Sequence, residues 1–89
     1  MNRYYFSNHI TWQLEKVSNQ VYILDRYNNS SYLFNKVSRD IWIMISYKLT
    51  INDMSDIIAE RYQIDKNKAY KDIKNFIDGL LNEGIIYEE

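Results

Sequence analysis

Few residues of this 89-residue chain could carry out chemistry, and they do not gather into a catalytic pattern. His9 is the only histidine, and so the only ordinary general base near neutral pH, and it has no cysteine or glycine-rich loop beside it. Asp53 and Asp56 are close along the chain, but acid–base work needs such carboxylates in a walled cleft, which so small a chain rarely provides. The serines fall in expected turns, caps and helices, and none has a nucleophile-elbow context. We therefore expect no enzymatic activity, no metal site and no cofactor.

Length and composition predict one domain spanning residues 1–89. Hydrophobic residues make up 46% of the chain, and nine tyrosines and two tryptophans supply large apolar side chains for its core. The absence of cysteine excludes disulfides and thiolate zinc sites. The longest apolar run covers residues 41–45, far short of the roughly 20 residues that a membrane span needs. The N-terminus also lacks the longer apolar stretch of a signal peptide, so we expect a cytoplasmic location. Because the net charge is only −1, we expect no long-range attraction to nucleic acid or to an anionic membrane.

Three short strands are expected in the first half of the chain. Residues 11–17 show a weak alternation of apolar and polar side chains, and residues 21–25 are rich in β-branched and aromatic side chains. Residues 31–35 follow a turn at 27–30, where asparagines tolerate the left-handed backbone that tight hairpins need. The spacing predicts an antiparallel sheet.

The rest of the chain has helical periodicity. Ser38 can cap a first helix, and Thr50 with Asp53 resembles a capping box that opens a second. Asp65 can cap a third, longer helix that reaches about Asn82. The apolar stripes expected to face the core are, helix by helix, Val37, Ile41, Trp42 and Ile45; Met54, Ile57, Ile58 and Tyr62; and Ala69, Ile73, Phe76 and Leu80.

The order of these elements predicts the fold class. Gly84 fits the end of the third helix, and residues 85–87 form a short apolar tail, either a last strand or a plug on the core. Phe34, Trp42 and Phe76 are assigned to the core. The chain is therefore expected to be α+β and winged helix-turn-helix-like, with a three-stranded antiparallel sheet followed by three helices.

A winged-helix protein could bind DNA through its third helix, so that alternative has to be weighed. The third helix does have lysines on the side opposite its core stripe, but acidic residues interrupt them and no arginine accompanies them. The lysines are Lys66, Lys68, Lys71 and Lys74, and the acidic residues that interrupt this face are Asp72 and Asp78. A solvated face explains this pattern better than a DNA-binding face.

An apolar groove is expected between the third strand and the third helix. Tyr70, Ile77 and Leu81 widen the apolar stripe of the helix to one side, with Lys74 at the rim, although these side chains could also simply cover the core. If residues 31–35 form a sheet edge beside that flank, their unpaired N–H and C=O groups make one wall of the groove and the helix makes the other. An extended peptide could then add to the sheet as a further strand.

The predicted binding residues come from both walls. In the strand, Tyr32 and Phe34 face one side, so Leu33 on the other side is expected to meet a ligand or solvent. The predicted set is Ser31, Tyr32, Leu33, Phe34 and Asn35 of the strand, mainly through the backbone, and Tyr70, Ile73, Lys74 and Ile77 of the helix.

A set of short motifs in fixed order points to a known family. These motifs are Ile23-Leu24-Asp25, Tyr32-Leu33-Phe34-Asn35, Ile41-Trp42, Thr50, Tyr62, Asp72-Ile73, Phe76-Ile77 and Gly84-Ile85. In this order and spacing, from about Trp12 to Ile86, the chain resembles the PqqD-like family of peptide-recognition elements. It departs from the family at Phe34, where leucine is usual, and at Tyr47-Lys48, a turn that often contains glycine.

The resemblance implies a protein that binds the leader segment of the precursor of a ribosomally synthesised and post-translationally modified peptide (RiPP) and presents it to a separate modifying enzyme. Leader binding would raise the effective concentration of the precursor at that enzyme. The partners usual in the family are radical-SAM enzymes, or leader peptidases and cyclases as for lasso peptides. A chain that ends at Glu89 without a linker resembles the free rather than the enzyme-fused form. Because an uncovered strand edge can also pair with a second copy, we expect a monomer or weak homodimer.

Overall fold

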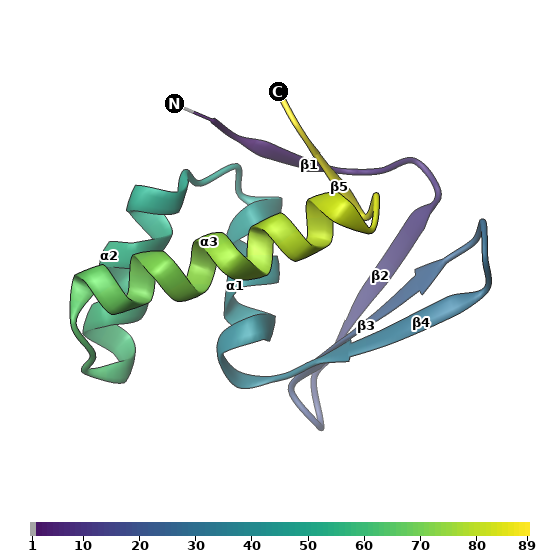
Figure 1. Cartoon of the computed structure of the whole chain (residues 1–89). Coiled ribbons are helices and arrows are strands. Elements are labelled where there is room, and N and C mark those ends of the chain that lie inside the picture. Colours follow the sequence, from purple (N-terminus) through teal and green to yellow (C-terminus); the bar gives the residue numbers. More distant parts are fainter. Residues whose placement is uncertain (1) are drawn as a thin grey trace.

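Two hairpins build a three-stranded antiparallel sheet in the first half of the molecule (Figure 1). The structure is a computed structural model and describes residues 2–89. Strands β2 (Ile10–Glu15), β3 (Gln20–Asp25) and β4 (Ser30–Phe34) lie in the order β2-β3-β4, which confirms the predicted sheet. Asn19 and Asn29 adopt positive φ angles of 57° and 58° in the two turns, the conformation that asparagine tolerates better than most residues.

A second, two-stranded ribbon joins the two ends of the chain. Strand β1 (Tyr4–Phe6) pairs with β5 (Ile86–Glu88) in antiparallel register, and the rings of Tyr5 and Tyr87 stack at 5.5 Å. The apolar tail therefore forms a strand, one of its two predicted alternatives. Strand β1 is not predicted from the sequence, because so short a segment is a strand only through a partner at the far end of the chain.

Three helices follow the sheet, as predicted. Helix α2 (Ile51–Tyr62) begins with a complete capping box between Thr50 and Asp53, and helix α3 (Lys66–Asn82) is capped by the side chain of Asp65. Both caps are confirmed because a capping motif is a local interaction that a few neighbouring residues determine.

The predicted cap of the first helix is wrong. Helix α1 (Lys36–Ser46) begins after Asn35, which is its N-cap residue and not the last residue of β4. The Ser38 hydroxyl donates a hydrogen bond of 2.8 Å to the Asn35 carbonyl within the first turn. Lys36 enters the helix with φ of +48°, so the strand continues into the helix through a sharp bend that the sequence pattern does not reveal.

The core lies between the helices and one face of the sheet. Trp42 of α1 is fully buried at its centre, stacked on Phe6 at 4.3 Å and edge-on to Trp12 and Phe34. Alternate residues of β3 are buried against the helices, whereas Tyr22 and Leu24 are exposed on the opposite face. The helices therefore cover one face of the sheet only. No helix within residues 2–89 is long and apolar enough to cross a membrane.

Candidate functional site

Strand β4 lies at an edge of the sheet with its outer backbone groups unpaired. Within residues 2–89 only β3 pairs with it, in a register that sets Ile23 opposite Tyr32. Its side chains alternate as predicted: Leu33 is 51% exposed on the open face, and Tyr32 and Phe34 are half-buried on the helix side. An edge of this kind offers a row of N–H and C=O groups to another strand.

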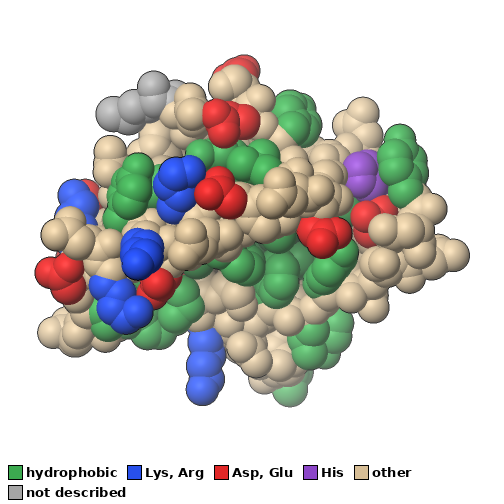
Figure 2. Space-filling model, in the orientation of Figure 1, with side chains coloured by type: hydrophobic (Ala, Val, Ile, Leu, Met, Phe, Trp, Pro, Cys, Tyr) green, Lys and Arg blue, Asp and Glu red, His purple; other side chains and the backbone are tan. Residues whose placement is uncertain are grey.

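A hollow of about 370 Å³ lies between β4 and the C-terminal half of α3, and we call it the β4–α3 groove. Its walls are largely apolar and include one charged side chain, Glu83 of the helix end. Figure 2 shows apolar side chains gathered along the border between α3 and the sheet. The lining residues are Tyr32, Phe34, Asn75, Phe76, Gly79, Leu80, Glu83 and Ile85.

The residue types of the groove explain its shape. Phe34 of β4 meets Phe76 of α3 edge-to-face at 5.2 Å, which fixes the spacing between strand and helix at one end. Gly79 leaves the middle open, since a Cβ atom at this position would have no neighbour within 4 Å. Leu80 and Ile85 are buried and close the floor. The result is an open apolar slot that runs alongside an unpaired backbone edge.

The residues predicted from the sequence for the helix wall do not line the β4–α3 groove. Ile73 and Ile77 are 1% and 0% exposed and belong to the core, so their side chains cannot meet a ligand. Tyr70 does not line the groove. It is nine residues, or two and a half helical turns, from Gly79, and therefore lies on the opposite side of α3. Lys74 lies on the outer surface, with its ammonium group 3.3 Å from the Asp78 carboxylate.

The flank that bears Tyr70 is occupied by other parts of the chain. Tyr70 borders a smaller hollow together with Asn2 and Tyr4 at the N-terminal end and Thr50 at the start of α2. Tyr4 is only 4% exposed beneath this region. The apolar surface that widens the helix stripe on this side is therefore partly covered by the N-terminal segment. The groove residues missed by the sequence analysis lie opposite, where Asn75, Gly79 and Glu83 give no apolar signal.

The lysines of α3 are compensated by carboxylates. Three of the four have an acidic partner within salt-bridge distance, so this face presents little net charge to a nucleic acid backbone. The pairs are Lys66–Asp56 at 2.8 Å, Lys68–Asp72 at 3.1 Å and Lys74–Asp78 at 3.3 Å. The DNA-binding alternative is not favoured.

His9 packs beside a strand end and not in a cleft. Its ring stacks on that of Tyr27 at 4.0 Å, and its Nε2 lies 3.7 Å from the carboxylate of buried Asp25. No group of three or more histidine, aspartate or glutamate side chains in the described part of the chain could hold a metal ion. This arrangement fits a packed, structural histidine.

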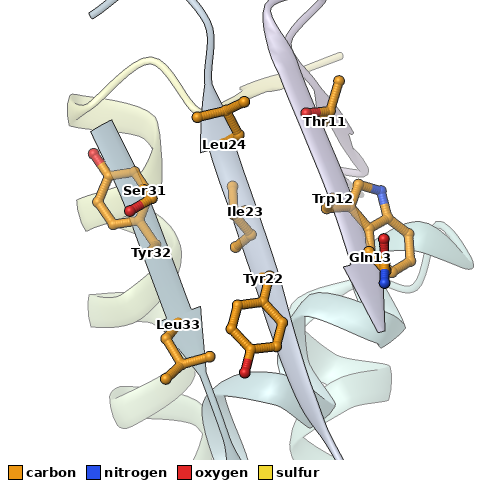
Figure 3. Close-up of a pocket in the computed structure, with 9 residues that line it drawn as sticks. All are labelled: Thr11, Trp12, Gln13, Tyr22, Ile23, Leu24, Ser31, Tyr32 and Leu33. Atoms are coloured by element: carbon orange, nitrogen blue, oxygen red, sulfur yellow. The ribbon is translucent and has the colours of Figure 1, made fainter. Parts of the chain in front are cut away.

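The open face of the sheet forms another surface next to the β4 edge, with a hollow of about 490 Å³ (Figure 3). Tyr22 and Leu33 lie side by side on β3 and β4, and Leu24 lies further along β3. These three side chains are 46%, 51% and 43% exposed, and polar neighbours such as Thr11 and Ser31 surround them. A strand added to β4 would extend this face as well as fill the groove.

Comparison with known proteins gives one family and two structural neighbours. The family described as Coenzyme PQQ synthesis protein D (PqqD) matches residues 20–86. A structure described as TbiB1 in complex with the TbiA(beta) leader peptide has a TM-score of 0.82 at 17% identity, over 91% of this chain and 92% of that chain. A structure described as lasso peptide synthetase B1 complexed with the leader peptide has a TM-score of 0.86 at 14% identity, over 96% and 98%. No protein of curated function matches in sequence. At these identities the structural likeness establishes the fold alone.

Proposed function

The chain belongs to the Coenzyme PQQ synthesis protein D (PqqD) family, and from this premise we propose that it binds the leader segment of a ribosomally synthesised precursor peptide by adding it as a strand to β4. The observation that supports this proposal most directly is the unpaired edge of β4 beside the apolar β4–α3 groove. Both structural neighbours were solved with leader peptides bound, which agrees with the proposal.

Strand addition would use both parts of the site. The leader backbone would pair with β4, and every second leader side chain would enter the groove above Phe34, Phe76 and Gly79. The remaining side chains would lie beside Ser31 and Leu33 on the open face. A volume of about 370 Å³ accommodates a few apolar side chains, and it falls within the range of roughly 300–1,000 Å³ typical of ligand sites.

The bound leader would serve as a tether for a separate modifying enzyme. A dissociation constant near 1 μM, or about −8 kcal/mol, would hold the precursor long enough to raise its concentration at the enzyme. We propose that the enzyme is a radical-SAM enzyme or a leader peptidase or cyclase, and that the chain acts as one non-catalytic, cofactor-free domain in the cytoplasm.

An NMR titration with a panel of N-methylated peptides would test strand addition. The probe is the leader half of a short precursor encoded beside the gene, added to ¹⁵N-labelled protein. We expect shifts confined to residues 30–34 and to the groove side of α3. Replacing single leader N–H groups by N-methyl should abolish binding at every second position only, because alternate residues of an added strand face β4.

Three results would count against the proposal. The first is equal tolerance of N-methyl groups at all leader positions, and the second is a set of chemical-shift changes that does not include β4. The third concerns a mixed-sequence DNA duplex as the comparison ligand: binding of the duplex with chemical-shift changes on the outer face of α3 would favour the winged-helix DNA-binding alternative.

A further inference from the structure

Another hollow, of about 430 Å³, lies between the β2–β3 hairpin, α1 and α2, and we call it the α1–α2 pocket. It shares no lining residue with the β4–α3 groove. Its walls are apolar, formed by Leu14, Ile43, Met44, Tyr47, Leu49 and Ile57. Leu14 and Tyr47 are 38% and 74% exposed, so the pocket has apolar side chains open to solvent.

An ion cluster around the buried carboxylate of Asp40 forms the polar side of this pocket. The Asp40 carboxylate accepts hydrogen bonds from the Tyr62 hydroxyl at 2.6 Å and from Nε and Nη2 of Arg39 at 3.1 and 3.0 Å. Arg39 donates to Oδ1 of the carboxylate, whereas Tyr62 donates to Oδ2, and Nη1 of Arg61 lies 3.1 Å from the same Oδ2. Two guanidinium groups therefore compensate one carboxylate, and a surplus positive charge remains beside an apolar surface in a chain whose net charge is −1.

Arg61 holds that surplus charge where a ligand can reach it. Its side chain is 53% exposed, against 18% for Arg39, whose Nη1 also donates to the Asn19 carbonyl at 2.9 Å. Within residues 2–89, Asp40 is the only carboxylate within salt-bridge distance of Arg61. A guanidinium has five N–H donors in a planar fork that matches a carboxylate, so Arg61 retains donors for a second one.

We propose that the α1–α2 pocket docks a segment of a partner protein that presents an apolar side chain next to an aspartate or glutamate. The carboxylate pairs with the free edge of Arg61, and the apolar side chain packs between Leu14 and Leu49. A leader carrier needs a second surface for its enzyme that leaves the leader site open, and this pocket meets that requirement. The docking site is nevertheless defined by its own residues and is testable without any leader peptide.

Matched peptides that differ in one charge would test the docking site. The probes are a capped Gly-Leu-Glu-Phe-Gly peptide and analogues with glutamine or lysine in place of the glutamate, each titrated into ¹⁵N-labelled protein. We expect the glutamate peptide to shift Leu14, Ile43, Leu49 and the side-chain Nε–H of Arg61. The glutamine analogue should bind at least about tenfold more weakly, because it keeps the shape but loses the charge-assisted pair.

Protein variants separate docking from folding. Arg61→Gln should reduce the affinity for the glutamate peptide to that of the glutamine analogue, and Arg61→Lys should restore part of it. Lys71→Gln, a charge removal at an exposed position of α3, should change nothing, and thermal unfolding of each variant checks its fold. Equal affinity for the glutamate and glutamine peptides, or shifts confined to the β4–α3 groove, would overturn the proposal.

Discussion

Gly79 occupies a helix interior, where glycine is normally unfavourable, and it faces the β4–α3 groove with free space above its Cα atom. A larger residue at this position should have opposite effects on two quantities: it should raise the stability of the helix and lower the affinity for the leader. Gly79→Gln should stabilise the protein by up to about 1 kcal/mol, because glycine has a poor helix propensity and the new side chain meets no obstacle. The same side chain would project into the groove and should weaken leader binding by about tenfold or more.

Thermal unfolding and a leader titration together measure both effects of Gly79→Gln. Lys71→Gln introduces the same side chain at an exposed position outside the groove and should leave leader affinity unchanged. A Gly79→Gln protein that is stable and binds the leader as tightly as the wild type would place the leader elsewhere.

Asp40 gives the chain a pH-dependent stability. Burial alone would raise the pKa of its carboxyl group, but hydrogen bonds from Tyr62, Arg39 and Arg61 outweigh burial and hold the pKa below its ordinary value. A carboxylate with a depressed folded-state pKa stabilises the protein above its unfolded pKa of about 3.9, and this contribution is lost as the pH falls through the folded-state value. Asp40→Asn should therefore cost about 2–4 kcal/mol at pH 7 and progressively less below pH 4.

Urea unfolding of the wild type and of Asp40→Asn at several pH values from 7 to 3 measures this difference. Asp53→Asn is a useful comparison, since Asp53 also has a lowered pKa but its side chain is exposed, in the capping box of α2. A difference between Asp40→Asn and the wild type that stays constant with pH would show that Asp40 acts through packing and not through its charge.

At the level of elements, the sequence predicts features that depend on a few neighbouring residues. It does not predict features that depend on contacts between distant parts of the chain. The caps at Thr50 and Asp65 and the alternation in β4 are local, and all three are confirmed. The apolar stripe of α3 is also visible in the sequence, but the flank that faces β4 is not. Strand β1, which depends on pairing with β5, brings the N-terminal segment against Tyr70 and leaves the less apolar Gly79 side facing the edge strand.

Helix α2 ends with a residue in a conformation that glycine adopts at lower cost. Gln63 is its C-cap, with φ of 55° and ψ of 49°, and left-handed backbone costs a non-glycine residue roughly 1 kcal/mol. Gln63→Gly should raise the free energy of unfolding by about 0.5–1 kcal/mol, whereas Gln63→Ala should not, since alanine retains the Cβ atom. Chemical unfolding of both variants measures this. Equal effects of the two substitutions would point to the Gln63 side chain, which donates to the Glu60 carbonyl, and not to the backbone.

The molecule is a flat body, about 36 × 33 × 18 Å, whose three-stranded sheet is covered on one face. No strand within residues 2–89 pairs with either of its two edges. The edge of β4 lies beside the exposed side chains of Tyr22 and Leu33. It can pair with the strand of a peptide or with β4 of a second copy. We therefore expect weak, concentration-dependent dimerisation through β4. A saturating leader peptide should suppress it, because peptide and second copy compete for the same backbone groups.

Sedimentation velocity over a range of protein concentrations, with and without leader peptide, shows whether the dimer forms through the β4 edge or the β2 edge. Leu33→Lys places a charge on the open face of the edge strand and should weaken the dimer, because like charges on two paired copies repel. Thr11→Lys introduces the same charged side chain on β2, at the other edge, and should have no effect on a dimer formed through β4. A dimer that persists in saturating peptide, and that Thr11→Lys disrupts instead, would assign self-association to β2 and leave the β4 edge to the leader alone.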